Sequence, residues 1–135
     1  MDAERELLVV EDDDALRVVV RETLSSAGYK VIDCPDPSQA LAAAATSACI
    51  DLLITDCVMP GMSGFQLAQA LRGARPGTPV LYMSGHSPRL LNLADDTPVD
   101  FLAKPFTGRT LLERVALRLA NVRARRPAAT AAVVK

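Results

Sequence analysis

Residues 7–12 are Leu-Leu-Val-Val-Glu-Asp, and residues 52–56 are Leu-Leu-Ile-Thr-Asp. In each stretch a short apolar run ends directly on an acidic residue. A continuous apolar run of this length is typical of a parallel strand that is buried on both faces. Three further candidate strands are Val31–Ile32, Val80–Met83 before Ser84, and Val99–Ala103 before Lys104. The pattern therefore predicts five strands, four of which run into residues that can carry chemistry.

Stretches with a helical spacing of apolar residues separate these strands. One runs from Asp14 to Ala27 and stops at Gly28, a common residue after a helix end. The next begins with Asp36 as N-cap and Pro37 in the first turn, and a third begins with a capping box of Ser63 and Gln66. The last begins at Thr107 and carries an apolar stripe, formed by Leu112, Val115, Leu119 and Val122.

Two segments give weaker signals. Between Pro88 and Pro98 three leucines lie among prolines. We expect a helix there to be short or irregular, with at most about two turns between the two prolines. After Arg126 the sequence is Pro-Ala-Ala-Thr-Ala-Ala, with little to pack against a core. We expect one domain over residues 1–126 and a flexible C-terminal tail over residues 127–135.

Strands and helices that alternate in this way predict an α/β fold, with right-handed crossovers and a doubly wound parallel sheet. The carboxyl ends of all strands of a parallel sheet lie along one edge, where ligands bind. We therefore expect Glu11, Asp12, Asp56, Ser84 and Lys104 to meet there. Three ionised carboxylates repel one another unless a cation joins them, and their hard oxygen atoms favour Mg²⁺, for which Mn²⁺ can substitute.

Each of these residues also has a plainer explanation. Acidic residues in a first helical turn stabilise the helix dipole, and we favour that role for Asp13 and Asp14. Asp56 could be a loop residue or a cap, but the next helix already has Ser63 as its cap. An ionised aspartate at this position can attack phosphorus directly and form an aspartyl phosphate. The Lys104 ammonium and the Ser84 hydroxyl would then bind the phosphoryl group.

Two other residues near these strand ends receive the plainer explanation. His86, the only histidine, follows Ser84 in a loop, and we expect it to be exposed there, with an effect on attack by water as the alternative. Cys57 has no partner histidine beside it in the sequence, so we expect packing rather than chemistry.

Composition excludes several classes of protein. The chain has 135 residues, a formal charge of −1 and 50% apolar residues. We therefore expect one aliphatic core, and we expect neither general binding to nucleic acid nor binding to a membrane surface. No run approaches the roughly 18 apolar residues of a membrane span. Three cysteines without a C-x-x-C pair indicate reduced thiols and a cytoplasmic location.

Four motifs together resemble the receiver domain of two-component response regulators: residues 8–13 (Leu-Val-Val-Glu-Asp-Asp), 51–64 (Asp-Leu-Leu-Ile-Thr-Asp-Cys-Val-Met-Pro-Gly-Met-Ser-Gly), 83–85 (Met-Ser-Gly) and 101–106 (Phe-Leu-Ala-Lys-Pro-Phe). The resemblance covers about residues 6–122. It implies a flavodoxin-like sheet with strand order 2-1-3-4-5. That order is the one that known members have, so we take it from the resemblance rather than from the residues alone.

The resemblance further implies phosphotransfer to Asp56 from a histidine kinase or a histidine phosphotransfer protein. Asp12 and Asp56 would contact Mg²⁺ directly, Val58 would add its backbone carbonyl, and Glu11 would act largely through water. Phe101 falls at the aromatic switch position of the family. The protein would then be no enzyme apart from self-catalysed phosphoryl transfer to Asp56 and hydrolysis from it, and we expect a monomer or a weak dimer.

The sequence departs from the usual pattern of the family in two places. Glu11 stands where many members have Asp, and the weak helix between Pro88 and Pro98 is similar to that of receivers attached to hybrid sensor kinases. The chain is then either a free-standing receiver or a receiver cut from a hybrid kinase.

Two other functions stay open as alternatives. One is a pseudo-receiver that only binds protein, and the other is a phosphohydrolase with Asp56 as nucleophile. Such hydrolases need a second acid two residues after the nucleophile, where this chain has Val58.

Overall fold

Five parallel strands form one sheet at the centre of the molecule. The structure is a computed structural model that describes residues 5–47, 49–85 and 100–133, with side chains to residue 120. The strands lie in the order β2-β1-β3-β4-β5, which confirms the predicted order. Their bounds are Glu6–Val10 for β1, Lys30–Cys34 for β2, Leu52–Asp56 for β3, Val80–Ser84 for β4 and Phe101–Ala103 for β5. Because all neighbours pair in parallel, their carboxyl ends lie at one edge.

In the described part of the chain, four helices connect and follow these strands, and the residues that begin them are those that the sequence indicates. Their bounds are Asp14–Ser26 for α1, Pro37–Thr46 for α2, Gly64–Ala74 for α3 and Gly108–Val133 for α4. The Asp36 carboxylate accepts from the Gln39 N–H as N-cap of α2. Ser63 and Gln66 form the predicted capping box of α3. After α1 the chain turns at Gly28, whose positive φ of 101° glycine adopts without a steric cost.

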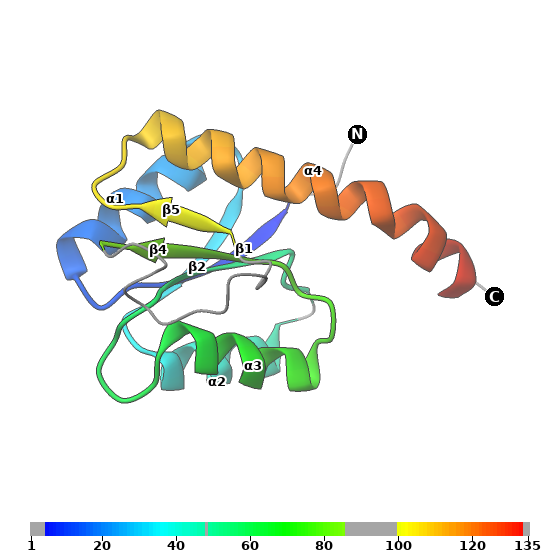
Figure 1. Cartoon of the computed structure of the whole chain (residues 1–135), viewed down its shortest axis with the longest axis horizontal. Helices are drawn as coiled ribbons and strands as arrows, with labels where there is room; N and C mark the ends of the chain where they lie inside the picture. Colours follow the sequence, from blue (N-terminus) through cyan, green and yellow to red (C-terminus); the bar gives the residue numbers. More distant parts are fainter. Residues whose placement is uncertain (1–4, 48, 86–99, 134–135) are drawn as a thin grey trace.

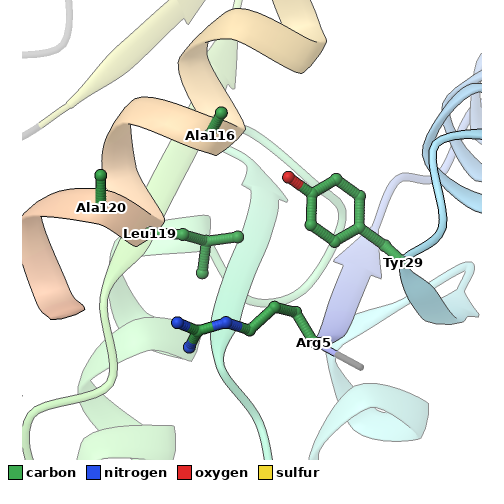
Figure 2. Close-up of a pocket in the computed structure, with 5 residues that line it drawn as sticks. All are labelled: Arg5, Tyr29, Ala116, Leu119 and Ala120. Carbon is green, nitrogen blue, oxygen red and sulfur yellow. The ribbon is translucent and has the colours of Figure 1, made fainter. Parts of the chain in front are cut away.

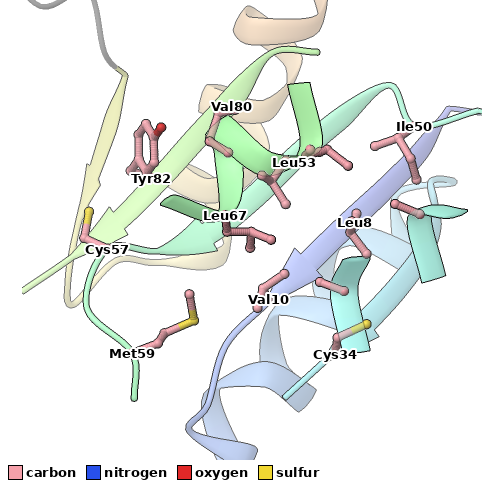
Figure 3. Packing of buried hydrophobic residues seen from close by; sticks show 14 residues of the cluster. Leu8, Val10, Cys34, Ile50, Leu53, Cys57, Met59, Leu67, Val80 and Tyr82 are labelled. Carbon is pink, nitrogen blue, oxygen red and sulfur yellow. The ribbon is translucent and has the colours of Figure 1, made fainter. Parts of the chain in front are cut away.

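Two layers of helices cover the two faces of the sheet: α1 and α4 lie on one side, and α2 and α3 on the other (Figure 1). Side chains along a strand point alternately to the two faces, so one apolar run supplies both cores. Leu8, Val10 and Leu53 pack toward α2 and α3 (Figure 3). Leu7 and Val9 pack toward α1 and α4. This double burial explains why the strands are continuously apolar rather than alternating.

The structure differs from the sequence prediction in the length of two strands. Strand β2 is longer than Val31–Ile32 because five of its residues pair with β1. Strand β5 is shorter than predicted, and Val99 lies outside the described residues. The predicted irregular helix between Pro88 and Pro98 also lies outside them.

Helix α4 continues past Arg126 to Val133, and its end extends beyond the sheet (Figure 1). Alanine, which fills much of that stretch, has the highest helix propensity. The division of the chain at residue 126 stays a prediction. Within the described part of the chain, no helix combines the length and the apolar character that a membrane crossing needs.

Candidate functional site

Three carboxylates meet at the carboxyl edge of the sheet. Glu11 and Asp12 directly follow β1, and Asp56 is the last residue of the neighbouring strand β3. One carboxylate oxygen from each lies within 4.8 Å of the others. Glu11 is 1% exposed and Asp56 is 5% exposed, whereas Asp12 lies at the surface. The predicted convergence of these acids is therefore present, with two of them buried and one open to solvent.

The Lys104 ammonium, which follows β5, reaches both buried acids. Its Nζ lies 2.6 Å from Asp56 Oδ1 and 3.0 Å from Glu11 Oε1. Apart from this ion pair, the buried Glu11 Oε1 accepts no hydrogen bond from the residues that the structure describes. Two carboxylates therefore compete for one ammonium, and Asp12 adds a third negative charge nearby.

This excess of negative charge changes the protonation of the site. Burial and the nearby Glu11 carboxylate raise the pKa of Asp56 to about 8, although Lys104 opposes the shift. Burial lowers the pKa of Lys104, but hydrogen bonds to Asp56 and Glu11 outweigh it and raise the pKa overall. Without a further cation, Asp56 therefore takes up a proton more readily than an ordinary aspartate does.

A cavity of about 240 Å³ opens beside Asp56 and Lys104. Ser84, the last residue of β4, lines it and is 5% exposed, whereas Val58 lines it from the surface at 60% exposure. The sheet ladder extends to this point, because the Cys57 N–H donates to the Met83 carbonyl and the Lys104 N–H donates to the Ser84 carbonyl. All the predicted site residues, from Glu11 to Lys104, thus lie at this edge. His86 lies outside the described residues.

The residue that directly follows Asp56 carries a thiol. Cys57 is buried, and burial raises the pKa of its thiol to about 11. A thiol in that state is a poor nucleophile, which agrees with a packing role. The aromatic rings nearby form a cluster: Phe101 lies with its ring centroid 5.7 Å from that of Tyr82 and 6.3 Å from that of Phe65.

Three supporting residues were not found from the sequence. The buried Thr55 hydroxyl donates to the Asp56 carbonyl at 3.0 Å, and the Gly64 N–H donates to the Cys57 carbonyl at 2.9 Å. Arg17 donates to the Glu11 carbonyl at 2.9 Å. A hydroxyl inside an apolar strand is a usable signal for Thr55. Nothing in the sequence near Gly64 or Arg17 indicates which strand end they contact. The Lys104–Pro105 peptide bond is cis.

A second hollow, of about 180 Å³, lies at the opposite edge of the sheet. Arg5 and Tyr29, which precede β1 and β2, line it together with Leu119 and two alanines of α4 (Figure 2). Arg5 pairs with Asp51 at 3.6 Å, so its charge is already balanced. This hollow is separate from the acid cluster, which lies at the other ends of the same strands.

The donor set fits a hard divalent cation. Mg²⁺ binds through one or a few carboxylates and keeps several waters, and the group of Glu11, Asp12 and Asp56 offers oxygen atoms that lie both buried and open to water. A bound cation would also balance the charge that Lys104 alone leaves uncompensated.

Comparisons with known proteins agree with this geometry. Residues 7–116 match the family described as the response regulator receiver domain. The response regulator protein FleR of Pseudomonas aeruginosa is 38% identical over 112 residues, which are 82% of this chain and 24% of the relative. The transcriptional regulatory protein CpxR of Escherichia coli K12 is 36% identical over 114 residues, which are 81% of this chain and 47% of the relative. The chain spans about a quarter of the former and about half of the latter.

Solved structures give the same result. The receiver domain of the hybrid histidine kinase CckA is 39% identical with a TM-score of 0.72, covering 84% of this chain and 98% of that one. The chemotaxis protein CheY4 of Vibrio cholerae is 32% identical with a TM-score of 0.78, covering 86% of this chain and 99% of that one. The chain therefore belongs to the response regulator receiver domain family of two-component signalling.

Proposed function

We propose that this protein accepts a phosphoryl group on Asp56 from a phosphohistidine, with Mg²⁺ at the acid cluster, and thereby switches an output surface. The donor is a histidine kinase or a histidine phosphotransfer protein, and the exchange takes place in the cytoplasm. The observation that carries the proposal is the contact of 2.6 Å between Lys104 Nζ and the Asp56 carboxylate, beside a cavity that opens to solvent.

The chemistry follows from the placement of these groups. An Asp56 oxygen forms a bond to phosphorus while the bond from phosphorus to the histidine nitrogen breaks, and that nitrogen keeps the electron pair. The Lys104 ammonium stabilises the negative charge on the phosphoryl oxygens, and the Ser84 hydroxyl donates to one of them. Later attack by water returns the carboxylate and releases inorganic phosphate, so any turnover is self-catalysed.

Glu11, Asp12, Asp56 and the backbone carbonyl of Val58 would hold the metal ion. When bound, Mg²⁺ supplies positive charge that neutralises the phosphoryl oxygens. The resting ion pairs of Lys104 keep the acids together before phosphorylation.

The switch uses the pairing between β4 and β5. Ser84 pairs with Ala103, and Tyr82 pairs with Phe101. A Ser84 that moves toward the phosphoryl group would shift this end of β4, and the half-buried Phe101 ring would turn inward against Tyr82. Phosphorylation then shifts a population between two packings of this strand pair.

The test is the intact mass of the protein after incubation with acetyl phosphate and Mg²⁺. We expect a gain of one phosphoryl group in the wild type and none in Asp56→Asn. Asp36→Asn is the matched control, because asparagine still caps α2 and the residue is not part of the acid cluster. No gain from acetyl phosphate or from a kinase would instead favour a pseudo-receiver, and steady hydrolysis of phosphoesters would favour a phosphohydrolase.

A further inference from the structure

The Arg17 side chain joins three parts of the molecule around the acid cluster. It projects from the first turns of α1 and is 15% exposed. Its Nη1 donates to the Glu11 carbonyl at 2.9 Å. Its Nη2 lies 2.7 Å from Asp14 Oδ1, and its Nε lies 3.4 Å from Asp33 Oδ2 on β2. One guanidinium therefore ties the loop after β1 to both α1 and β2.

That loop carries two of the three carboxylates. The Glu11 N–H donates to the Cys34 carbonyl at 3.1 Å, and the Glu11 carboxylate accepts from the Asp13 N–H at 3.0 Å. Asp13 in turn caps α1 by accepting from the Leu16 N–H. Asp12 lies between these two anchored residues. Arg17 supplies the side-chain contact to the Glu11 carbonyl, which belongs to the peptide group that joins Glu11 to Asp12.

We propose that Arg17 is a positioning residue for the metal site: it fixes the peptide group between Glu11 and Asp12, and thereby the directions in which both carboxylates point. The inference rests on the proposed function, since it assumes that this cluster binds Mg²⁺. Hydrogen bonds that orient metal-ligating groups typically change metal affinity by about 10- to 100-fold when they are removed.

The sign of the effect separates positioning from simple electrostatics. A positive guanidinium near a cation site repels the cation, so removal of its charge alone would strengthen Mg²⁺ binding. Removal of an orienting hydrogen bond has the opposite effect, because the carboxylates lose their arrangement and must pay its entropic cost on binding. Weaker Mg²⁺ binding in a variant without the guanidinium therefore supports positioning.

Arg21 offers a matched control on the same helix. Its Nη1 also approaches Asp33 Oδ2, at 3.6 Å, and its Nη2 lies 3.2 Å from Glu22 Oε2. Within the described residues, Arg21 makes no hydrogen bond or ion pair to Glu11. Arg17→Met and Arg21→Met both keep an aliphatic stem and lose one positive charge, but only the first loses the contact to the loop.

The experiment measures Mg²⁺ binding to the whole chain by isothermal titration calorimetry, with urea unfolding of each variant as a check on folding. We expect about tenfold weaker binding in Arg17→Met, and wild-type affinity or slightly tighter binding in Arg21→Met. Phosphorylation by acetyl phosphate should need correspondingly more Mg²⁺ in Arg17→Met and should reach the wild-type extent at saturation.

Arg17→Lys guards against a failure to fold, because lysine keeps the charge and the stem but cannot contact all three partners at once. It should also bind Mg²⁺ more weakly than wild type does. Wild-type or tighter affinity in both Arg17 variants would overturn the inference, as would equal weakening in Arg21→Met. Mg²⁺ binding without phosphorylation of wild-type Asp56 would instead overturn the proposed function alone, and a wild type that binds no Mg²⁺ would overturn both.

Discussion

Replacement of Gly64 by alanine should destabilise this protein strongly and disturb the phosphoryl acceptor. Gly64 is the first residue of α3 and lies directly against the end of β3. A Cβ added there would lie 2.0 Å from the Asp56 carbonyl oxygen and 3.2 Å from Cys57 Cα. Real Cβ atoms essentially never lie closer than 3.0 Å to such an atom, so α3 and β3 would have to separate by about 1 Å.

The obstructing atoms belong to the backbone, which cannot rotate away as a flexible side chain can. Overpacking of a close-packed region typically costs about 1–3 kcal/mol, and we expect the upper end, about 3 kcal/mol. With a urea m-value of about 1.5 kcal/mol/M, the unfolding midpoint would fall by about 2 M. Far-UV circular dichroism in urea measures this shift, since the chain contains no tryptophan.

Gly73 in the same helix is the matched control. A Cβ there would have no heavy atom within 4 Å, so Gly73→Ala gains helix propensity without a clash. We expect it to stabilise the protein by about 0.5 kcal/mol. A Gly64→Ala protein whose unfolding free energy lies within about 0.5 kcal/mol of wild type would refute the steric reasoning. In folded Gly64→Ala, the displaced Asp56 should also gain the phosphoryl group more slowly.

Two further predictions concern titration and thiol chemistry. Without metal, Asp56 has a pKa of about 8 in the folded protein, whereas the ordinary pKa of an aspartate is 3.8. Because the folded state binds this proton more tightly than the unfolded state does, the free energy of unfolding should fall as pH rises between these two values. Urea unfolding in EDTA at pH 5 and pH 8 should show this fall in wild type and a smaller one in Asp56→Asn; an equal pH dependence in both would contradict the assignment. At pH 8 the exposed Cys49 should react with a thiol reagent well before Cys34 and Cys57, because burial protects both and raises the pKa of their thiols. Peptide mass spectrometry after brief labelling would detect the contrary outcome, early modification of Cys57.

Much of the local structure could be predicted because its causes lie within a few residues. The Asp36 cap, the Ser63 and Gln66 capping box and the turn at Gly28 depend on side chains and backbone freedom at neighbouring positions. The apolar runs that become β1 and β3 depend on burial of both sheet faces, which composition alone makes visible.

Element lengths were less well predicted, since pairing and packing set them. Strand β2 extends to Lys30–Cys34 because β1 offers it five paired residues, although Asp33 is not a typical strand residue. Helix α4 continues beyond Arg126 to Val133, through a stretch that is rich in alanine, the residue of highest helix propensity.

The sequence by itself determined which chemical groups stand at the strand ends: an acid pair after β1, an acid on β3, a hydroxyl on β4 and a lysine after β5. Only the tertiary structure decided that Lys104 contacts both Glu11 and Asp56, that Gly64 lies against the Asp56 carbonyl, and that Arg17 holds the Glu11 carbonyl. The Lys104 contacts join strand ends that several crossovers bring together, whereas the Gly64 and Arg17 contacts depend on how α3 and α1 approach the strands that precede them. Their distances depend on how helices pack on the sheet, which the local pattern of residues does not encode.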